Sequence, residues 1–104
     1  MHQFDVLANP FPASRGRHPF LVALQSDLLT RTLDTIVVAP LERAASGTFA
    51  DRLNPQVAVD GEPFALIAQE IATVRKSALR NPVGSLAAER DKIIAALDLL
   101  FTGF

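Results

Sequence analysis

The chain of 104 residues contains no cysteine, no tryptophan and no tyrosine. The lack of cysteine excludes disulfides, zinc–thiolate sites and thiol catalysis, and it is typical of proteins in a reducing compartment. No apolar run approaches the roughly 20 residues that span a bilayer. The remaining composition, 49% apolar with seven phenylalanines, is enough to build a core without a metal or a disulfide.

The chain also has no large excess of positive or negative charge. The formal net charge is −1 and the pI is about 6.0, which argues against a general nucleic-acid binder because phosphate contacts need clustered Lys and Arg. The start of the sequence has no basic segment followed by an apolar one, so no signal peptide is predicted. We therefore expect one domain over residues 1–104, soluble and cytoplasmic, with no membrane or nucleic-acid partner.

Short apolar segments in the first half predict β-strands. Residues 3–8 alternate in hydropathy, as in a half-buried strand. Residues 20–26 form a continuous apolar run rich in Phe and Val, which is typical of a strand covered on both faces. Two prolines and a glycine make the intervening segment, residues 9–17, a loop. Residues 35–39 predict a third strand that ends at Pro40, because proline lacks the amide that a central ladder requires.

The clearest local signal is the hairpin predicted over residues 57–66. Asp60 and Gly61 supply the two positive φ angles of a type I′ turn, and alternating apolar residues flank them. Pro63 places the start of the returning strand at an edge or a bulge.

Two further segments are less regular. Residues 42–47 are small and polar, which indicates a turn or a short helical piece. Residues 73–79 predict one more strand with Arg75 and Lys76 facing solvent, where Glu70 is a candidate surface partner worth well under about 1 kcal/mol.

The last twenty residues predict a helix with Ser85 as its N-cap. At about 100° per residue, one broad face is apolar; it comprises Leu86, Ile93, Ile94, Leu97, Leu100 and Phe101. Asp91, Ala95, Asp98 and Thr102 share another face. Short antiparallel strands followed by one C-terminal helix predict a mainly β fold, a small barrel or strongly bent sheet with the helix packed against it.

The residues offer little catalytic chemistry. His2 and His18 have no spacing that supports a general base, and we interpret both as solvated. Asp91 and Asp98 are two helical turns apart, about 10 Å along the axis, with no histidine beside them. No phosphate loop, nucleophile elbow or zinc motif is present. We therefore expect no catalytic residue, no metal and no cofactor.

Several segments together carry a resemblance to a known family. They are Gln3-Phe4-Asp5-Val6, the run from Phe20 to Leu29, Val37 to Leu41, the strand and turn from Pro55 to Gly61, and the ending Phe101-Thr102-Gly103-Phe104. In these the chain resembles the CcdB toxins of bacterial toxin–antitoxin modules, which poison DNA gyrase. The resemblance covers essentially the whole chain and implies a homodimer with an SH3-like barrel, a fold related to that of MazF toxins.

The resemblance also implies two binding sites. The gyrase A subunit would contact Thr102, Gly103 and Phe104. A CcdA-like antitoxin, whose disordered C-terminal segment folds on binding, would contact Ser26, Leu28, Leu29, Asp98, Phe101 and Thr102. The family function is inhibition by binding, which traps gyrase on cleaved DNA.

Two positions depart from the pattern of the best-known members. Thr102 stands where they carry a tryptophan, whose ring can stack on a gyrase arginine and typically supplies about 2 kcal/mol or more. Asp98 stands where they carry a side chain with a neutral amide group, and its negative charge suits a basic partner segment.

Three alternatives stay open. A homologue of this fold could act on a protein target other than gyrase. A MazF-like ribonuclease toxin would need cations that hold the phosphate and a general base. The candidates are Arg15, Arg17 and His18. A peptide-binding SH3-like domain would use an aromatic-lined groove, which a chain with phenylalanine alone favours less.

Overall fold

The computed structural model describes residues 1–104 as seven β-strands, two α-helices and four single turns of 3-10 helix. The strands are β1 (Asp5–Ala8), β2 (Phe20–Ala23), β3 (Thr35–Arg43), β4 (Gln56–Val59), β5 (Glu62–Leu66), β6 (Ala72–Arg75) and β7 (Gly84–Ser85). The α-helices are α1 (Asp27–Thr32) and α2 (Arg90–Thr102), and the 3-10 turns are Ala44–Ser46, Ala68–Glu70, Lys76–Ala78 and Ala87–Glu89. The predicted fold class, mainly β with a C-terminal helix, is confirmed.

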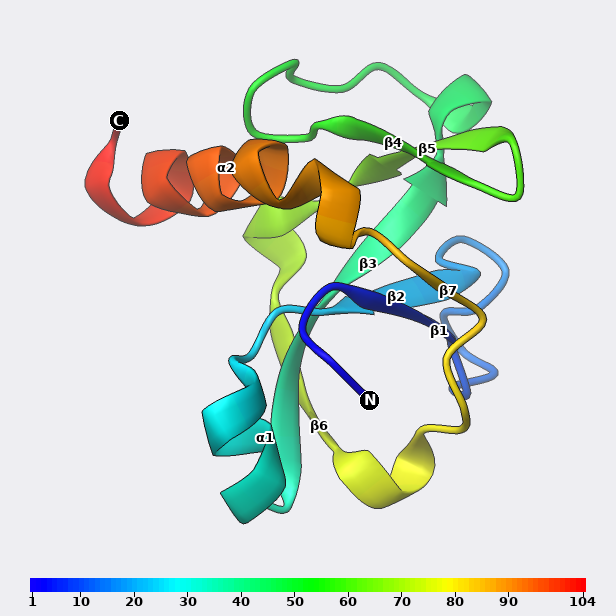
Figure 1. The fold of residues 1–104 in the computed structure, drawn as a ribbon. Coiled ribbons are helices and arrows are strands. Elements are labelled where there is room, and N and C mark those ends of the chain that lie inside the picture. The colour runs from blue at the N-terminus through cyan, green and yellow to red at the C-terminus, as the bar shows by residue number, and fades with distance from the viewer.

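All strands join one antiparallel sheet in the order β4-β5-β3-β2-β1-β7, and β6 also pairs with β3. The sheet bends strongly, and α2 crosses one side of it (Figure 1). The two edge strands face a common cavity of about 210 Å³, which is lined by Ala58 and Val59 of β4 and by Gly84 and Ser85 of β7. The sheet is therefore a nearly closed barrel, as the sequence predicts.

The inner strands are covered on both faces. Val6 and Val22 are paired and belong to the larger hydrophobic cluster beneath α2, whereas the neighbouring pair Leu7 and Leu21 belongs to a second cluster on the opposite face. The prediction of a strand covered on both faces is thus confirmed, but the strand ends at Ala23 rather than at residue 26. The prediction that residues 3–8 are half-buried is wrong, because both faces of β1 are covered and only Ala8 is exposed.

Pro40 lies inside β3 and does not end it, so the predicted boundary at residue 39 is wrong. On one side of β3 the partner changes at this point, from β6, which pairs up to Val38, to β5, which begins opposite Leu41. The Pro40 carbonyl points to that side, where it accepts a hydrogen bond from the amide of Ile67 at 3.0 Å. The missing amide of Pro40 therefore falls in the gap between two partners and costs the ladder no bond.

The predicted hairpin is confirmed. Asp60 and Gly61 have φ angles of 51° and 79°, as a type I′ turn requires. Pro63 lies before the part of β5 that pairs with β3, so the amide that proline lacks is not needed for that pairing.

The segment after the hairpin differs from the prediction. β6 ends at Arg75 rather than at residue 79, and Lys76 does not face solvent, since its ammonium group donates to the carbonyl of Thr30. Glu70 pairs with Arg17, at 3.9 Å, rather than with Arg75 or Lys76.

The C-terminal helix begins later than predicted. Ser85 belongs to β7, and its hydroxyl accepts from the amide of Ala87 at 3.2 Å, at the start of a 3-10 turn that precedes α2. Only Ile93 and Ala96 of α2 are fully buried. In Figure 1 the C-terminal end of α2 extends past the strands. Neither helix is long and apolar enough to cross a bilayer.

The anchoring of α2 can be tested at two adjacent isoleucines. Ile93→Ala should lower the free energy of unfolding by about 2–5 kcal/mol, because it leaves a cavity in the closed core. Ile94→Ala should cost clearly less, about 1 kcal/mol, because Ile94 is only partly buried. Urea denaturation of both variants measures the difference, and equal losses would show that Ile93 does not anchor the helix.

Candidate functional site

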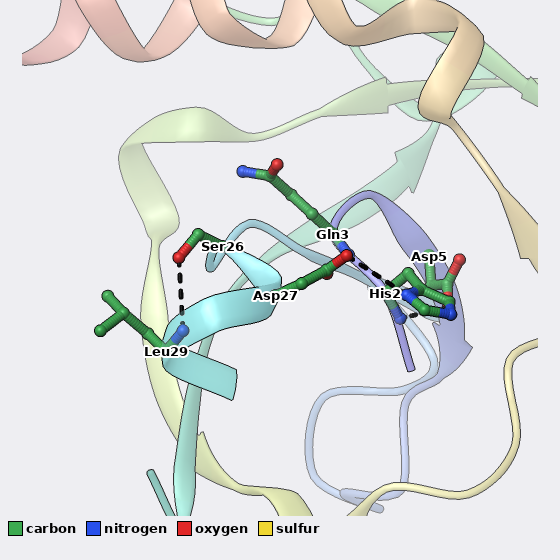
Figure 2. Close-up of polar contacts among 6 residues, drawn as sticks. All are labelled: His2, Gln3, Asp5, Ser26, Asp27 and Leu29. Carbon is green, nitrogen blue, oxygen red and sulfur yellow. Dashed lines mark hydrogen bonds and ion pairs between the residues drawn. The ribbon is translucent and has the colours of Figure 1, made fainter. Parts of the chain in front are cut away.

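Helix α1 is a structural feature that the sequence interpretation did not identify. The Ser26 hydroxyl accepts from the amide of Leu29 at 3.4 Å and caps the helix (Figure 2). At the other end, Lys76 binds the carbonyl of Thr30. Six residues are too few to show a helical periodicity. The Ser26-Asp27 pair before two leucines is nevertheless typical of a helix N-terminus and can be recognised in the sequence.

The carboxylate of Asp27 ties α1 to the start of the chain. It accepts from the amide of Gln3 at 2.7 Å and lies 3.2 Å from Nδ1 of His2 (Figure 2). The Gln3 amide, and then the His2 ring, hold the pKa of the Asp27 carboxyl below its ordinary value of 3.8. Asp5 fixes the same segment by accepting from the amide of His2 at 2.7 Å.

An apolar groove of about 470 Å³ lies between α1 and the C-terminal half of α2. Six of the eight residues that line it are hydrophobic; the lining is Leu24, Gln25, Ser26, Leu29, Val37, Ile71, Leu97 and Phe101. The side chain of Gln25, one of the two polar lining residues, is held in place because its Nε2 donates to the carbonyl of Thr35 at 3.0 Å. An apolar groove of this kind suits side chains of a protein partner better than a polar small molecule.

The end of α2 carries two exposed phenylalanines, of which Phe101 lines the groove. Phe101 and Phe104 are 71% and 84% exposed. Gly103 ends the helix in the left-handed conformation, at φ 82°, and its amide bonds the carbonyl of Leu99 at 3.0 Å. The Thr102 hydroxyl donates back to the carbonyl of Asp98 at 2.6 Å.

The structure brings together most of the residues assigned by family resemblance. Ser26, Leu29 and Phe101 line the groove, and Leu28, 66% exposed, lies beside it on α1. Asp98 and Thr102 lie on the exposed face of α2. The sequence interpretation missed that Leu24, Val37, Ile71 and Leu97 line one groove, because they come from four separate segments of the chain and nothing local indicates that they converge.

The predicted apolar face of α2 holds only in part. Ile93 is buried and Leu97 is half-buried, but Phe101 is exposed because α2 has run past the sheet at that point. The predicted polar face is exposed along its length, at Asp91, Ala95, Asp98 and Thr102.

Of the three candidate ribonuclease residues, one is buried and one is paired with carboxylates. His18 is 9% exposed and its Nε2 atom is buried without a partner, so the prediction of a solvated His18 is wrong. Arg17 is paired with Glu42 at 3.2 Å and lies 3.9 Å from Glu70, while Arg15 is exposed. His2 is exposed, as predicted, and its one side-chain partner is Asp27.

Comparisons with known proteins identify both a family and a fold. The family model described as CcdB protein matches residues 3–103. Among solved structures, the chain is similar to an endoribonuclease in complex with its cognate antitoxin from a mycobacterial species, with a TM-score of 0.74 and 16% identity, over 94% of this chain and 91% of that one. It is also similar to the Mycobacterium tuberculosis toxin MazF-mt6, with a TM-score of 0.65 and 17% identity, over 79% of this chain and 84% of that one. No curated protein matches the sequence. At this identity, the structural likeness establishes the fold alone.

The pH dependence of stability tests the Asp27 contacts. Because the folded-state pKa of Asp27 lies below that of the unfolded chain, its contacts stabilise the fold above pH 3.8 and are lost as the pH falls through the folded-state value. Asp27→Asn should therefore lower the urea midpoint at neutral pH and should change it little in strong acid. Asp34→Asn, at an exposed carboxylate whose side chain makes no hydrogen bond, is the control. A pH-independent deficit in Asp27→Asn would contradict this role.

Proposed function

The chain belongs to the CcdB family, and from this premise we propose that it is a toxin that binds the A subunit of DNA gyrase and traps the enzyme on cleaved DNA. Members of this family are the toxins of toxin–antitoxin systems. We place its action in the cytoplasm, where gyrase works on DNA. The proposed activity is inhibition by binding, with no catalytic residue, metal or cofactor.

The observation that carries this proposal is the exposed apolar surface around the end of α2. Phe101 and Phe104 are exposed at and just beyond the end of α2, and Leu28 and Leu29 are exposed on α1; of these, Leu29 and Phe101 line the groove. Large apolar side chains gathered in this way are costly to leave in water and mark sites of protein association. A surface of this chemistry supports binding of proteins rather than of nucleic acid, which needs clustered cations.

We assign the terminal residues Thr102, Gly103 and Phe104 to gyrase. They lie at the extremity of the molecule in Figure 1 and are all exposed. A projecting end can enter a recess of a large partner, whereas the groove behind it remains open to a flexible segment. Loss of the tryptophan ring at position 102 places the aromatic contact on Phe104 and Phe101.

We assign the groove and its rims to the antitoxin. A disordered segment can lay apolar side chains between Leu29 and Phe101, while Ser26 offers a hydroxyl at the same wall. Asp98, exposed on the same helix, is assigned to the antitoxin alone, and Thr102 is assigned to both partners. Antitoxin and gyrase would then compete for one end of the helix, which accounts for neutralisation.

A homodimer completes the proposal. Leu28 and Leu29 are assigned to the antitoxin, so the contact between the two chains must leave both side chains open. Two chains would also present two α2 ends to a two-fold symmetric partner such as the gyrase A dimer.

A ribonuclease is the second candidate, because the chain is similar in fold to endoribonucleases from mycobacterial species. It is less well supported by the side chains, since Arg17 is already paired with two carboxylates and His18 is buried. Incubation of the purified chain with cellular RNA tests it, with Arg15→Ala, Arg17→Ala and His18→Ala as variants. Cleavage that these variants abolish would favour this function over the first.

Removal of Gly103 and Phe104 tests the gyrase assignment. The truncated chain should lose toxicity on expression, because the projecting end of α2 is gone. It should keep its fold and its dimer, because both residues are exposed and lie outside the core. Growth after induction measures toxicity, and circular dichroism and sedimentation equilibrium check the fold and the mass. A truncated chain that still kills cells would contradict the assignment.

The residue at position 102 can be tested in the opposite direction. Thr102→Trp should strengthen binding to the gyrase A subunit by about 10- to 30-fold, because it adds a large ring beside Phe104. Ala95→Trp, on the same exposed face but two turns earlier, is the matched control and should give no gain. Equal affinities of Thr102→Trp and the unchanged chain, measured by surface plasmon resonance, would argue for a different target or contact.

A further inference from the structure

The residue that follows the helix cap is bound to a distant part of the chain. The Arg52 guanidinium donates from Nη2 to the backbone carbonyl of Phe104 at 3.2 Å. The two residues are 52 positions apart, and both are exposed. The contact holds the backbone of Phe104 and leaves its ring free, since the residue is 84% exposed.

Each of the last three residues takes part in a hydrogen bond. Thr102 donates to Asp98 and Gly103 donates to Leu99, both within α2. The left-handed conformation of Gly103 turns the chain away from the helix direction, so Phe104 lies beyond the reach of the helical ladder. Its bond to Arg52 is therefore what ties Phe104 to the rest of the fold.

The turn that carries Arg52 is itself firmly attached to the core. Asn54 is buried, and its amide closes the turn by donating to the carbonyl of Ala50 at 2.7 Å. The Asn54 side chain donates to the carbonyl of Leu66 at 3.3 Å and to Oε1 of Gln69 at 2.7 Å. Arg52 thus projects from a rigid turn fixed to β5 and to the 3-10 turn after it.

A second contact joins the same region to α2. The Lys92 ammonium donates to the carbonyl of Gln56 at 2.8 Å, just after the turn. The helix is therefore held to this part of the chain near its start by Lys92, and beyond its end by Arg52.

We propose that Arg52 is a positioning residue that fixes Phe104 in the conformation presented to the target, an inference that rests on the proposed function of the terminal residues. A segment that is already ordered loses less conformational entropy on binding, so its affinity is higher for the same contacts. A charged donor makes the stronger kind of hydrogen bond to a carbonyl. Arg52 acts through Phe104 and need not touch the target itself.

The test compares Arg52→Ala with Arg52→Lys and with Arg15→Ala, a control at an exposed arginine whose side chain makes no hydrogen bond. The heteronuclear ¹⁵N NOE of the Phe104 amide should fall in Arg52→Ala, recover in part in Arg52→Lys, and stay unchanged in Arg15→Ala. Affinity for the gyrase A subunit should fall about three- to tenfold in Arg52→Ala, mainly through faster dissociation. The thermal midpoint should not change.

A Phe104 amide that is equally ordered with and without Arg52 would overturn the inference, and so would unchanged affinity in Arg52→Ala. The NOE measurement needs no partner. If the unchanged chain fails to bind gyrase, the proposed function fails, while the NOE comparison still decides whether Arg52 orders Phe104.

Discussion

The attachment of α2 through its first half is the constraint on which the rest of the structure depends. Ile93 and Ala96 are its only fully buried residues, and Lys92 adds a hydrogen bond to the carbonyl of Gln56 beside them. Because the anchors lie early in the helix, the last turn runs past the sheet and carries Phe101 into solvent. The same geometry opens the groove, since α1 lies opposite a helix end that nothing covers. The buried contacts and the exposed apolar surface of α2 thus come from two halves of one helix.

The fold could be predicted where the signal is local. The hairpin at Asp60 and Gly61 needs only two positive φ angles, and the doubly covered β2 needs only an unbroken apolar run. The predicted strand end at Pro40 is wrong because β3 changes its partner strand at this residue. That change depends on β5 and β6, which lie far along the chain. The prediction that Ser85 caps α2 is wrong, because its hydroxyl bonds the amide of Ala87 in a 3-10 turn that separates it from the helix. The burial of His18 likewise depends on how the loop after β1 folds back.

The candidate site was predictable to a smaller extent. Periodicity placed Leu97 and Phe101 on one face of a helix, but it could not show where the helix leaves the sheet. Ser26, Leu28 and Leu29 came from family resemblance, and the structure places them at the cap and in the first turn of a short helix beside a groove that Ser26 and Leu29 line. The role of Arg52 could not be seen in the sequence, because its partner is 52 residues away and the contact depends on the turn around Asn54.

The most direct test of the account is a DNA cleavage and supercoiling assay with purified gyrase from the source organism. With this chain present, the account predicts that supercoiling stops and that linear DNA accumulates when the trapped complexes are denatured, in proportion to the amount of folded chain. Omission of gyrase should leave the DNA intact. Full supercoiling activity with no linear DNA, at concentrations where the chain is folded and dimeric, would contradict the claim that it is a gyrase poison.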